Sequence, residues 1–214
     1  MNPELAQSWQ QALRQLPLVA ILRGLSPGEA EGVGAQLTGA GFRLLEVPLN
    51  SPDPLASIAL LSRKHPDAIV GAGTVMTAAD VGAVHAAGGR LIVSPHFDVR
   101  VVRAAATLGL VCLPGVATPS EAFAALEAGA TGLKLFPAEM IPPAAVKAMR
   151  AVLPPEVLLF PVGGIAPLNM GPYRAAGADG FGIGSALYQP GRELQAVAAA
   201  AQAFADAWTG TMRA

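Results

Sequence analysis

The sequence has little charge, a single cysteine and no long apolar run. Of its 214 residues, 14% are charged and 52% are hydrophobic, and the net charge is −1. The 14 lysines and arginines are scattered and form no basic stripe that could follow a phosphate backbone, so we expect no nucleic-acid partner. Glycine and proline interrupt every apolar stretch except an alanine-rich C-terminal segment, which predicts a protein without a membrane span.

The scarcity of cysteine also limits what the chain can do. Cys112 has no partner for an internal disulfide, and no group of His, Cys and Asp residues has metal-ligand spacing, so we expect no metal site. Residues 1–15 carry acids and glutamines where a secretory signal would have a basic start and an apolar centre, which indicates a cytoplasmic protein. The length and apolar content predict one domain over residues 1–214.

A unit of roughly 20 to 25 residues repeats along the chain: an apolar β-type segment, polar residues, an alanine-rich helical segment and a glycine. The predicted strands are residues 18–23, 44–49, 69–75, 91–95, 111–116, 132–137, 158–163 and 180–185. Eight alternating units predict an α/β fold of the (β/α)8 TIM-barrel type, with residues 2–16 as an extra helix that closes the bottom. A doubly wound open sheet is the alternative, but residues 23–27 lack its glycine-rich first turn.

Capping residues mark the helix ends in this pattern. Ser26, Thr77 and Thr118 each precede a first turn with an acid at the third position, as a helix start requires. Glycines fall just past the helical segments, where the chain needs positive φ, at Gly41, Gly88, Gly109, Gly129 and Gly177.

Lys134 stands in the middle of an apolar strand, in Gly132-Leu133-Lys134-Leu135-Phe136-Pro137. A buried parallel strand is covered on both faces, so its ammonium would be desolvated and its pKa would fall. A neutral lysine amine is the usual nucleophile for a Schiff base with a carbonyl substrate. The alternative is an edge strand whose lysine reaches water, although edge strands normally alternate polar with apolar residues.

Other polar residues end neighbouring predicted strands. Glu46 and Lys134 both lie on even-numbered strands, and side chains from alternate strands share a layer inside a barrel. The two can then approach each other as an acid/base pair, or as a purely structural ion pair. Arg23 ends the first strand, Thr74 the third, and Ser94-Pro95-His96 the fourth. Because these polar groups converge on one mouth, they favour a substrate pocket over a structural ion pair. His96 lies at the mouth, where it could contact the substrate or have no role in binding, and we expect surface or packing roles for the other two histidines, His65 and His85.

Two glycine-rich segments follow strands seven and eight, Val162-Gly163-Gly164-Ile165 and Gly182-Ile183-Gly184-Ser185. Glycines let backbone N–H groups approach an anion, and Ser185 could open a short helix whose N-terminus favours negative charge. Because this fold repeatedly binds phosphate at these two loops, we expect Gly163, Gly164, Gly184 and Ser185 to hold a phosphate group.

With these residues placed, residues 16–191 resemble the KDPG/KHG aldolases, a class I family. The resemblance rests on the ordered motifs Ala20-Ile21-Leu22-Arg23-Gly24, Leu45-Glu46-Val47-Pro48-Leu49-Asn50, Gly71-Ala72-Gly73-Thr74-Val75, Ser94-Pro95, Leu113-Pro114-Gly115, Lys134-Leu135-Phe136-Pro137 and Val162-Gly163-Gly164-Ile165. It implies that Lys134 forms the Schiff base, that Glu46 is the general acid/base, and that Thr74, Pro95 and Phe136 line the pyruvate pocket. It also implies a homotrimer without a metal or an organic cofactor.

Two positions depart from the KDPG enzymes and resemble the branch that acts on 2-dehydro-3-deoxy-6-phosphogalactonate. Asn50 replaces an arginine that meets the substrate carboxylate, and Val162 replaces a threonine. The expected products are pyruvate and glyceraldehyde 3-phosphate, and Arg23 becomes the cation for the carboxylate or the phosphate. The gluconate epimer and 4-hydroxy-2-oxoglutarate remain alternative substrates.

Two other classes of function share parts of this pattern. A phosphate-binding barrel isomerase or synthase would have the same glycine loops but no need for a lysine within the sixth strand. A sugar-phosphate binding protein without catalysis would keep the pocket and tolerate loss of Glu46.

Overall fold

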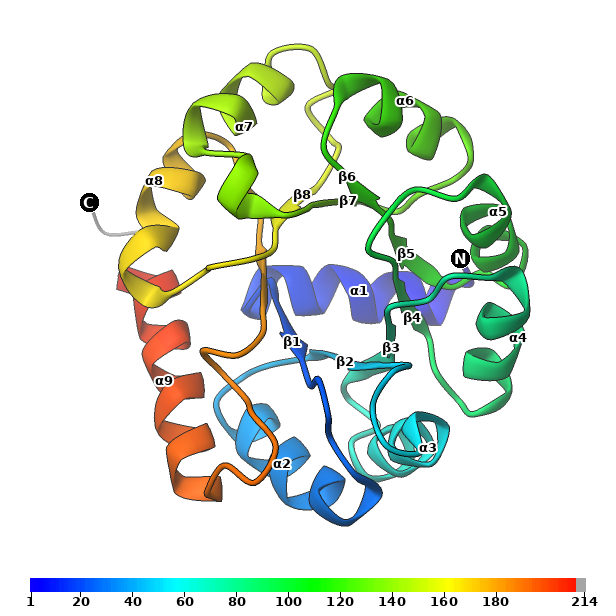
Figure 1. Cartoon of the computed structure of the whole chain (residues 1–214), viewed down its shortest axis with the longest axis vertical. Helices are drawn as coiled ribbons and strands as arrows, with labels where there is room; N and C mark the ends of the chain where they lie inside the picture. The colour runs from blue at the N-terminus through cyan, green and yellow to red at the C-terminus, as the bar shows by residue number, and fades with distance from the viewer. Residues whose placement is uncertain (211–214) are drawn as a thin grey trace.

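Parallel strands alternate with helices along the chain, as the repeated sequence pattern predicts (Figure 1). The computed structural model describes residues 1–210, so residues 211–214 of the predicted domain lie outside the described part. The strands are β1 (Leu18–Ile21), β2 (Leu44–Pro48), β3 (Ile69–Gly73), β4 (Leu91–Val93), β5 (Val111–Leu113), β6 (Gly115–Val116), β7 (Leu133–Leu135), β8 (Leu159–Pro161) and β9 (Phe181–Ile183). The helices are α1 (Pro3–Gln15), α2 (Pro27–Gly39), α3 (Pro54–Lys64), α4 (Ala78–Ala86), α5 (Val99–Thr107), α6 (Pro119–Glu127), α7 (Pro143–Arg150), α8 (Met170–Ala175) and α9 (Leu194–Gly210), with short 3-10 helices η1 (Ala138–Met140) and η2 (Pro167–Asn169).

The helix ends form where the capping residues predict them. In α4 the N–H of Asp80 donates to Thr77 Oγ1 at 3.1 Å, and the N–H of Thr77 donates to Asp80 Oδ2 at 2.9 Å. Thr118 and Glu121 make the same reciprocal pair at α6. These contacts satisfy N–H groups that a helix start leaves unpaired. Positive φ is confirmed at the five predicted stop positions, Gly41, Gly88, Gly109, Gly129 and Gly177.

The hydrogen-bonded strands form two parallel sheets instead of one continuous ladder. The larger has the order β5-β4-β3-β2-β1-β9 and the smaller β6-β7-β8. The predicted fifth strand is divided at Pro114, which has no N–H to donate, and its two halves pair with different neighbours, β4 and β7. A single bridge between Val162 and Gly182 links the other two ends. The α/β fold with a curled parallel sheet is confirmed, and the closed (β/α)8 barrel stays a prediction.

Helix α1 covers the N-terminal ends of the strands, and Figure 1 shows it crossing behind them. Its apolar side chains Leu5, Trp9 and Ala12 are buried. They join a cluster of inward-facing strand residues, including Val19, Leu44, Ile69, Leu91, Val111 and Phe160. Because this end is filled, space for a ligand is left at the C-terminal ends of the strands.

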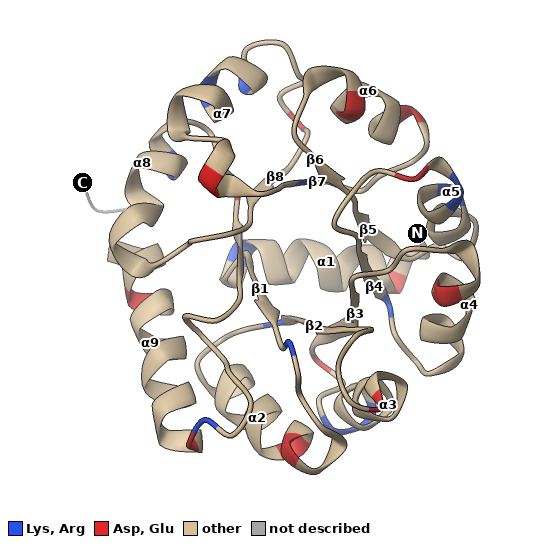
Figure 2. Ribbon diagram, in the orientation of Figure 1, with Lys and Arg blue, Asp and Glu red and all other residues tan. Residues whose placement is uncertain are grey.

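A larger apolar cluster lies between the strands and the surrounding helices, and joins Leu45 and Val47 of β2 to Val33 and Leu37 of α2. Lysines, arginines and acids are scattered over these helices and their loops (Figure 2). Within residues 1–210, no helix has the length and apolar character needed to cross a membrane.

Candidate active site

Lys134 lies at the centre of β7 with only 7% of its surface exposed. Its neighbours in the ladder are Gly115 of β6 and Phe160 of β8, and Phe160 belongs to the inward-facing cluster. The Nζ atom sits 4.4 Å from the centre of the Phe136 ring, which shares its face of the strand. The lysine therefore points inward from a strand covered on both sides, not outward from an edge.

Glu46 lies on β2, also buried, with 2% of its surface exposed. Its carboxylate rests against the backbone of Gly73 on β3, where a Cβ atom would collide with both oxygens. Among the described residues no group donates a hydrogen bond to Oε2. A buried carboxylate without a full set of hydrogen-bond partners lowers the stability of the fold, and such groups are typical of functional sites.

Burial shifts the pKa values of Glu46 and Lys134 in the directions that favour the uncharged form of each group. The pKa of Glu46 rises from 4.5 to about 7, mainly by desolvation, against the opposing positive charges of Lys134 and Arg23. Desolvation lowers the pKa of the Lys134 amine; the charge of Glu46 opposes this shift and that of Arg23 adds to it. The lysine is thus favoured as a nucleophile and the carboxyl group as a proton carrier near neutral pH.

Two further predicted residues lie beside backbone neighbours of the pair, and a third lies beyond the end of β4. Thr74 follows Gly73 directly and has a φ of 55°, a left-handed conformation that is strained for a residue of its type. The carbonyl of Pro95 lies against Gly115, the β6 residue paired with Lys134. His96 is exposed beyond the end of β4.

The two glycine-rich segments meet around a cavity of about 370 Å³. Its lining includes Arg23, Val162 and the four predicted phosphate residues, Gly163, Gly164, Gly184 and Ser185. Gly163 and Gly164 have φ values of 116° and 59°, so the turn needs glycine at both positions. The short helix predicted at Ser185 is wrong: a hydrogen-bonded turn closes there, with Leu187 and Tyr188 both donating to the Gly184 carbonyl, and α9 begins at Leu194.

Arg23 and Asn50 lie next to each other above β1 and β2. Nη1 of Arg23 donates to Oδ1 of Asn50 at 3.0 Å. Arg23 also lines the glycine cavity, which places its charge beside the turn that Gly163 and Gly164 form.

Known proteins resemble this chain in both sequence and structure. Residues 9–200 match the family model described as KDPG and KHG aldolase. The chain belongs to the KDPG and KHG aldolase family. It is 51% identical over 176 residues, 82% of this chain and 83% of the relative, to the "probable 2-dehydro-3-deoxy-6-phosphogalactonate aldolase" of Rhizobium meliloti strain 1021.

Two further matches agree with this family. The chain is 43% identical, over 94% of its length and 97% of the relative, to the 2-dehydro-3-deoxy-6-phosphogalactonate aldolase of Escherichia coli K12. A solved structure described as "Native KDPGal structure" superimposes with a TM-score of 0.92 at 42% identity, covering 94% of this chain and 98% of that one. The protein is therefore an aldolase, a carbon–carbon lyase.

The sequence reading missed two acids near the mouth of this aldolase. Glu139, in η1, lines the glycine cavity. Glu29 accepts hydrogen bonds from the Tyr188 hydroxyl at 3.2 Å and the Gly191 N–H at 3.1 Å, and so ties the start of α2 to the loop after β9. Glu29 carried a local signal only as a capping residue, and Glu139 carried none.

The aldolase offers no obvious place for a metal ion in the part of the chain that the structure describes, since no three His, Cys, Asp or Glu residues gather there.

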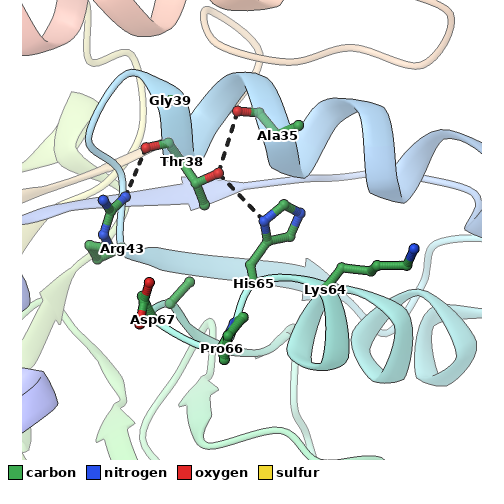
Figure 3. A pocket seen from close by; sticks show the side chains of 9 residues that line it. Ala35, Thr38, Gly39, Arg43, Lys64, His65, Pro66 and Asp67 are labelled. Carbon is green, nitrogen blue, oxygen red and sulfur yellow. Dashed lines mark hydrogen bonds between the residues drawn. The ribbon is translucent and has the colours of Figure 1, made fainter.

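A second cavity, of about 380 Å³, lies at the opposite ends of the strands, between the C-terminal ends of α2 and α3 (Figure 3). There Thr38 Oγ1 and His65 Nδ1 are 3.5 Å apart, and Arg43 Nη1 donates to the Thr38 carbonyl at 2.8 Å. His65 Nε2 is buried without a partner among the described residues and faces Gly34. Burial lowers the pKa of this imidazole, so His65 is a neutral packing residue.

Proposed function

We propose that this aldolase cleaves 2-dehydro-3-deoxy-6-phosphogalactonate to pyruvate and glyceraldehyde 3-phosphate through a Schiff base on Lys134. The proposal rests mainly on the inward-facing Lys134 amine. Burial lowers the pKa of this amine, and its charge interacts with that of Glu46. The substrate follows from the names of the relatives that are 51% and 43% identical.

In the first half of the reaction, the neutral Nζ of Lys134 attacks the C2 ketone, the protonated Glu46 carboxyl gives its proton to the departing hydroxyl, and loss of water gives an iminium ion. The C4 hydroxyl then gives its proton to the Glu46 carboxylate, the C3–C4 bond breaks, and its electron pair moves toward the iminium nitrogen. Glyceraldehyde 3-phosphate departs and an enamine of pyruvate remains on Lys134.

In the second half, Glu46 returns the proton to C3 of the enamine, and water hydrolyses the resulting iminium to pyruvate and free Lys134. A carboxyl group whose pKa lies at about 7 can accept and donate a proton at neutral pH with similar ease. One buried acid thus serves both halves of the reaction.

The remaining residues are proposed to hold the substrate along the C-terminal ends of the strands. The phosphate binds at the glycine turns with Arg23, through Gly163, Gly164, Gly184 and Ser185. The pyruvate half lies against Thr74, Pro95 and Phe136, next to Lys134. Val162 faces the C4 hydroxyl, and Asn50 orients Arg23 through its hydrogen bond.

Reductive trapping tests the central claim. Borohydride added with pyruvate should attach the three-carbon unit to Lys134 and inactivate the enzyme, as peptide mass spectrometry would show. Lys147→Ala, which changes an exposed lysine of α7, is the matched control and should trap normally. An adduct of equal yield in Lys134→Ala would overturn the assignment, and EDTA should leave the rate unchanged.

We further propose that the two sheets act as one closed (β/α)8 barrel. Support comes from the single-residue gap at Pro114 and from the bridge between Val162 and Gly182, which bring both sheet ends together. Hydrogen exchange should show the N–H of Gly182 protected like those of the central strands; rapid exchange would contradict closure.

By the same family resemblance, we propose a cytoplasmic homotrimer that serves galactonate breakdown. Large exposed apolar side chains at Met140 and Leu168 are the kind of surface that an interface covers. Sedimentation velocity should give a single species of three times the 21.7 kDa chain mass. A monomer at micromolar concentration would contradict the trimer.

A further inference from the structure

An acidic side chain lies inside the cavity to which we assign the phosphate. Glu139 follows β7 in η1 and lines this cavity together with Arg23, Gly163, Gly164 and Ser185. A carboxylate is an unexpected neighbour for a phosphate dianion, because like charges at short range repel each other.

The Glu139 carboxylate rests directly on the glycine turn. A Cβ atom built on Gly163 would collide with Oε2 and contact Oε1 at 3.1 Å. One built on Gly164 would lie 3.3 Å from Oε1 and from Cγ. The carboxylate therefore lies beside the α-carbons of both residues whose backbone N–H groups we assign to the phosphate.

No structural contact explains this position. Glu139 is exposed, and within residues 1–210 no group donates a hydrogen bond to its carboxylate. Its charge nevertheless acts on its surroundings, since it adds to the effect of burial in raising the pKa of Tyr173. Tyr173 itself donates to the carbonyl of Ala138 at 2.9 Å, which holds η1 in place beneath the carboxylate.

We propose that Glu139 is a competing anion that weakens phosphate binding at the Gly163-Gly164 turn and so promotes release of the phosphorylated product. This inference rests on the proposed function, which places a phosphate at that turn. Arg23 and Glu139 line the same cavity with opposite charges: the first attracts the phosphate and the second limits how tightly it is held. An enzyme whose product carries the same phosphate as its substrate benefits from such a limit, because tight binding of that shared group slows product departure.

Isothermal titration calorimetry with inorganic phosphate and with glycerol 3-phosphate tests the proposal at pH 8, where both ligands are dianions. Glu139→Gln keeps the shape and removes the charge, so it should bind both ligands roughly tenfold more tightly, as expected for exposed charges a few Å apart in a water-like dielectric. Glu139→Asp keeps the charge but withdraws it by one methylene, so its affinity for each ligand should lie between those of the wild type and Glu139→Gln. Glu127→Gln, at an exposed position on α6 that is not part of this cavity, controls for the change in net charge.

Salt and kinetics supply independent measurements. The gain in Glu139→Gln should shrink as ionic strength rises, because salt screens exposed charges. With the phosphorylated substrate, KM should fall and the ratio of KM to the wild-type value should follow the calorimetric ratio. Equal or weaker phosphate binding in Glu139→Gln, or an equal gain in Glu127→Gln, would overturn the proposal.

Borohydride trapping of pyruvate in the same variants separates this inference from the proposed function. Pyruvate has no phosphate, so loss of trapping in every variant and in the wild type would reject the Schiff-base mechanism alone. Tighter phosphate binding in Glu139→Gln would still establish the competing anion.

Discussion

Arg23 and Asn50, 27 residues apart in the chain, are joined by a hydrogen bond of 3.0 Å from Nη1 to Oδ1. The bond holds one end of a guanidinium that must otherwise sample many rotamers at an exposed position. Asn50→Ala should therefore raise KM for the phosphorylated substrate by about fivefold, the worth of roughly 1 kcal/mol, with little change in kcat. Steady-state kinetics with the phosphorylated substrate and its dephosphorylated analogue would check this, and an equal rise for both would argue against a link between Asn50 and the phosphate.

Glu46→Gln should separate activity from stability. Turnover should fall about 100-fold or more, because the proton carrier is lost, while pyruvate is still trapped on Lys134. Above pH 7 the free energy of unfolding should be higher in the variant than in the wild type, because the wild-type carboxylate is then ionised and buried without a hydrogen-bond partner on Oε2. The sign follows from the raised pKa: the wild type loses stability as the pH rises from the unfolded value of 4.5 through about 7, and the variant does not. Melting temperatures that run parallel for both proteins across this range would contradict the assignment.

Val162 is expected to set the preference between C4 epimers. An apolar side chain offers no hydrogen bond to the gluconate-type C4 hydroxyl, whereas threonine would, a difference of about 1 to 3 kcal/mol. The wild type should favour the galactonate-derived epimer with some activity on the other. Val162→Thr combined with Asn50→Arg should shift the ratio of kcat/KM toward the gluconate epimer. If the wild type already cleaves the gluconate epimer with about tenfold higher kcat/KM, the substrate assignment fails and the family stands.

His65 should make the fold less stable in mild acid. Its pKa is lowered in the folded protein by burial, so the unfolded chain takes up a proton first as the pH falls below the ordinary value of 6.5. The free energy of unfolding should then decrease through that window, with the neighbouring charges of Arg43 and Lys64 acting in the same direction and Glu31 opposing them. Urea unfolding of His65→Gln should show a flatter pH profile between pH 7 and pH 5, with the exposed His85→Gln as a control for loss of a histidine. A profile unchanged from the wild type would contradict this role.

Local signals in the sequence predicted the helix starts and two buried polar residues of the interior, Lys134 and Glu46. Thr77 and Asp80 lie three residues apart, so their reciprocal hydrogen bonds depend on nothing outside one turn. Lys134 and Glu46 needed only the two-residue period of a strand and the rule that alternate strands share a layer.

Features that depend on distant partners were beyond such reasoning. Glu139 reads as an ordinary exposed acid, and only the fold brings it onto Gly163. Pro114 was visible, but which neighbour each half of its strand would pair with depends on the curl of the whole sheet. The turn at Ser185 resembles a helix start, but the chain beyond it makes a second turn, with the N–H of Arg192 donating to the Gln189 carbonyl, before α9 begins.

The contact between Gly73 and Glu46 makes these two positions epistatic. A methyl group at position 73 has no room while a glutamate occupies position 46, because it would overlap both carboxylate oxygens. Gly73→Ala alone should thus be poorly tolerated, but should be partly rescued by Glu46→Ser, which leaves a gap where the carboxylate was. Evolution can fill this part of the interior only after it has given up the acid, so a non-catalytic descendant of this fold would be free to acquire a side chain at position 73 that no active ancestor could carry.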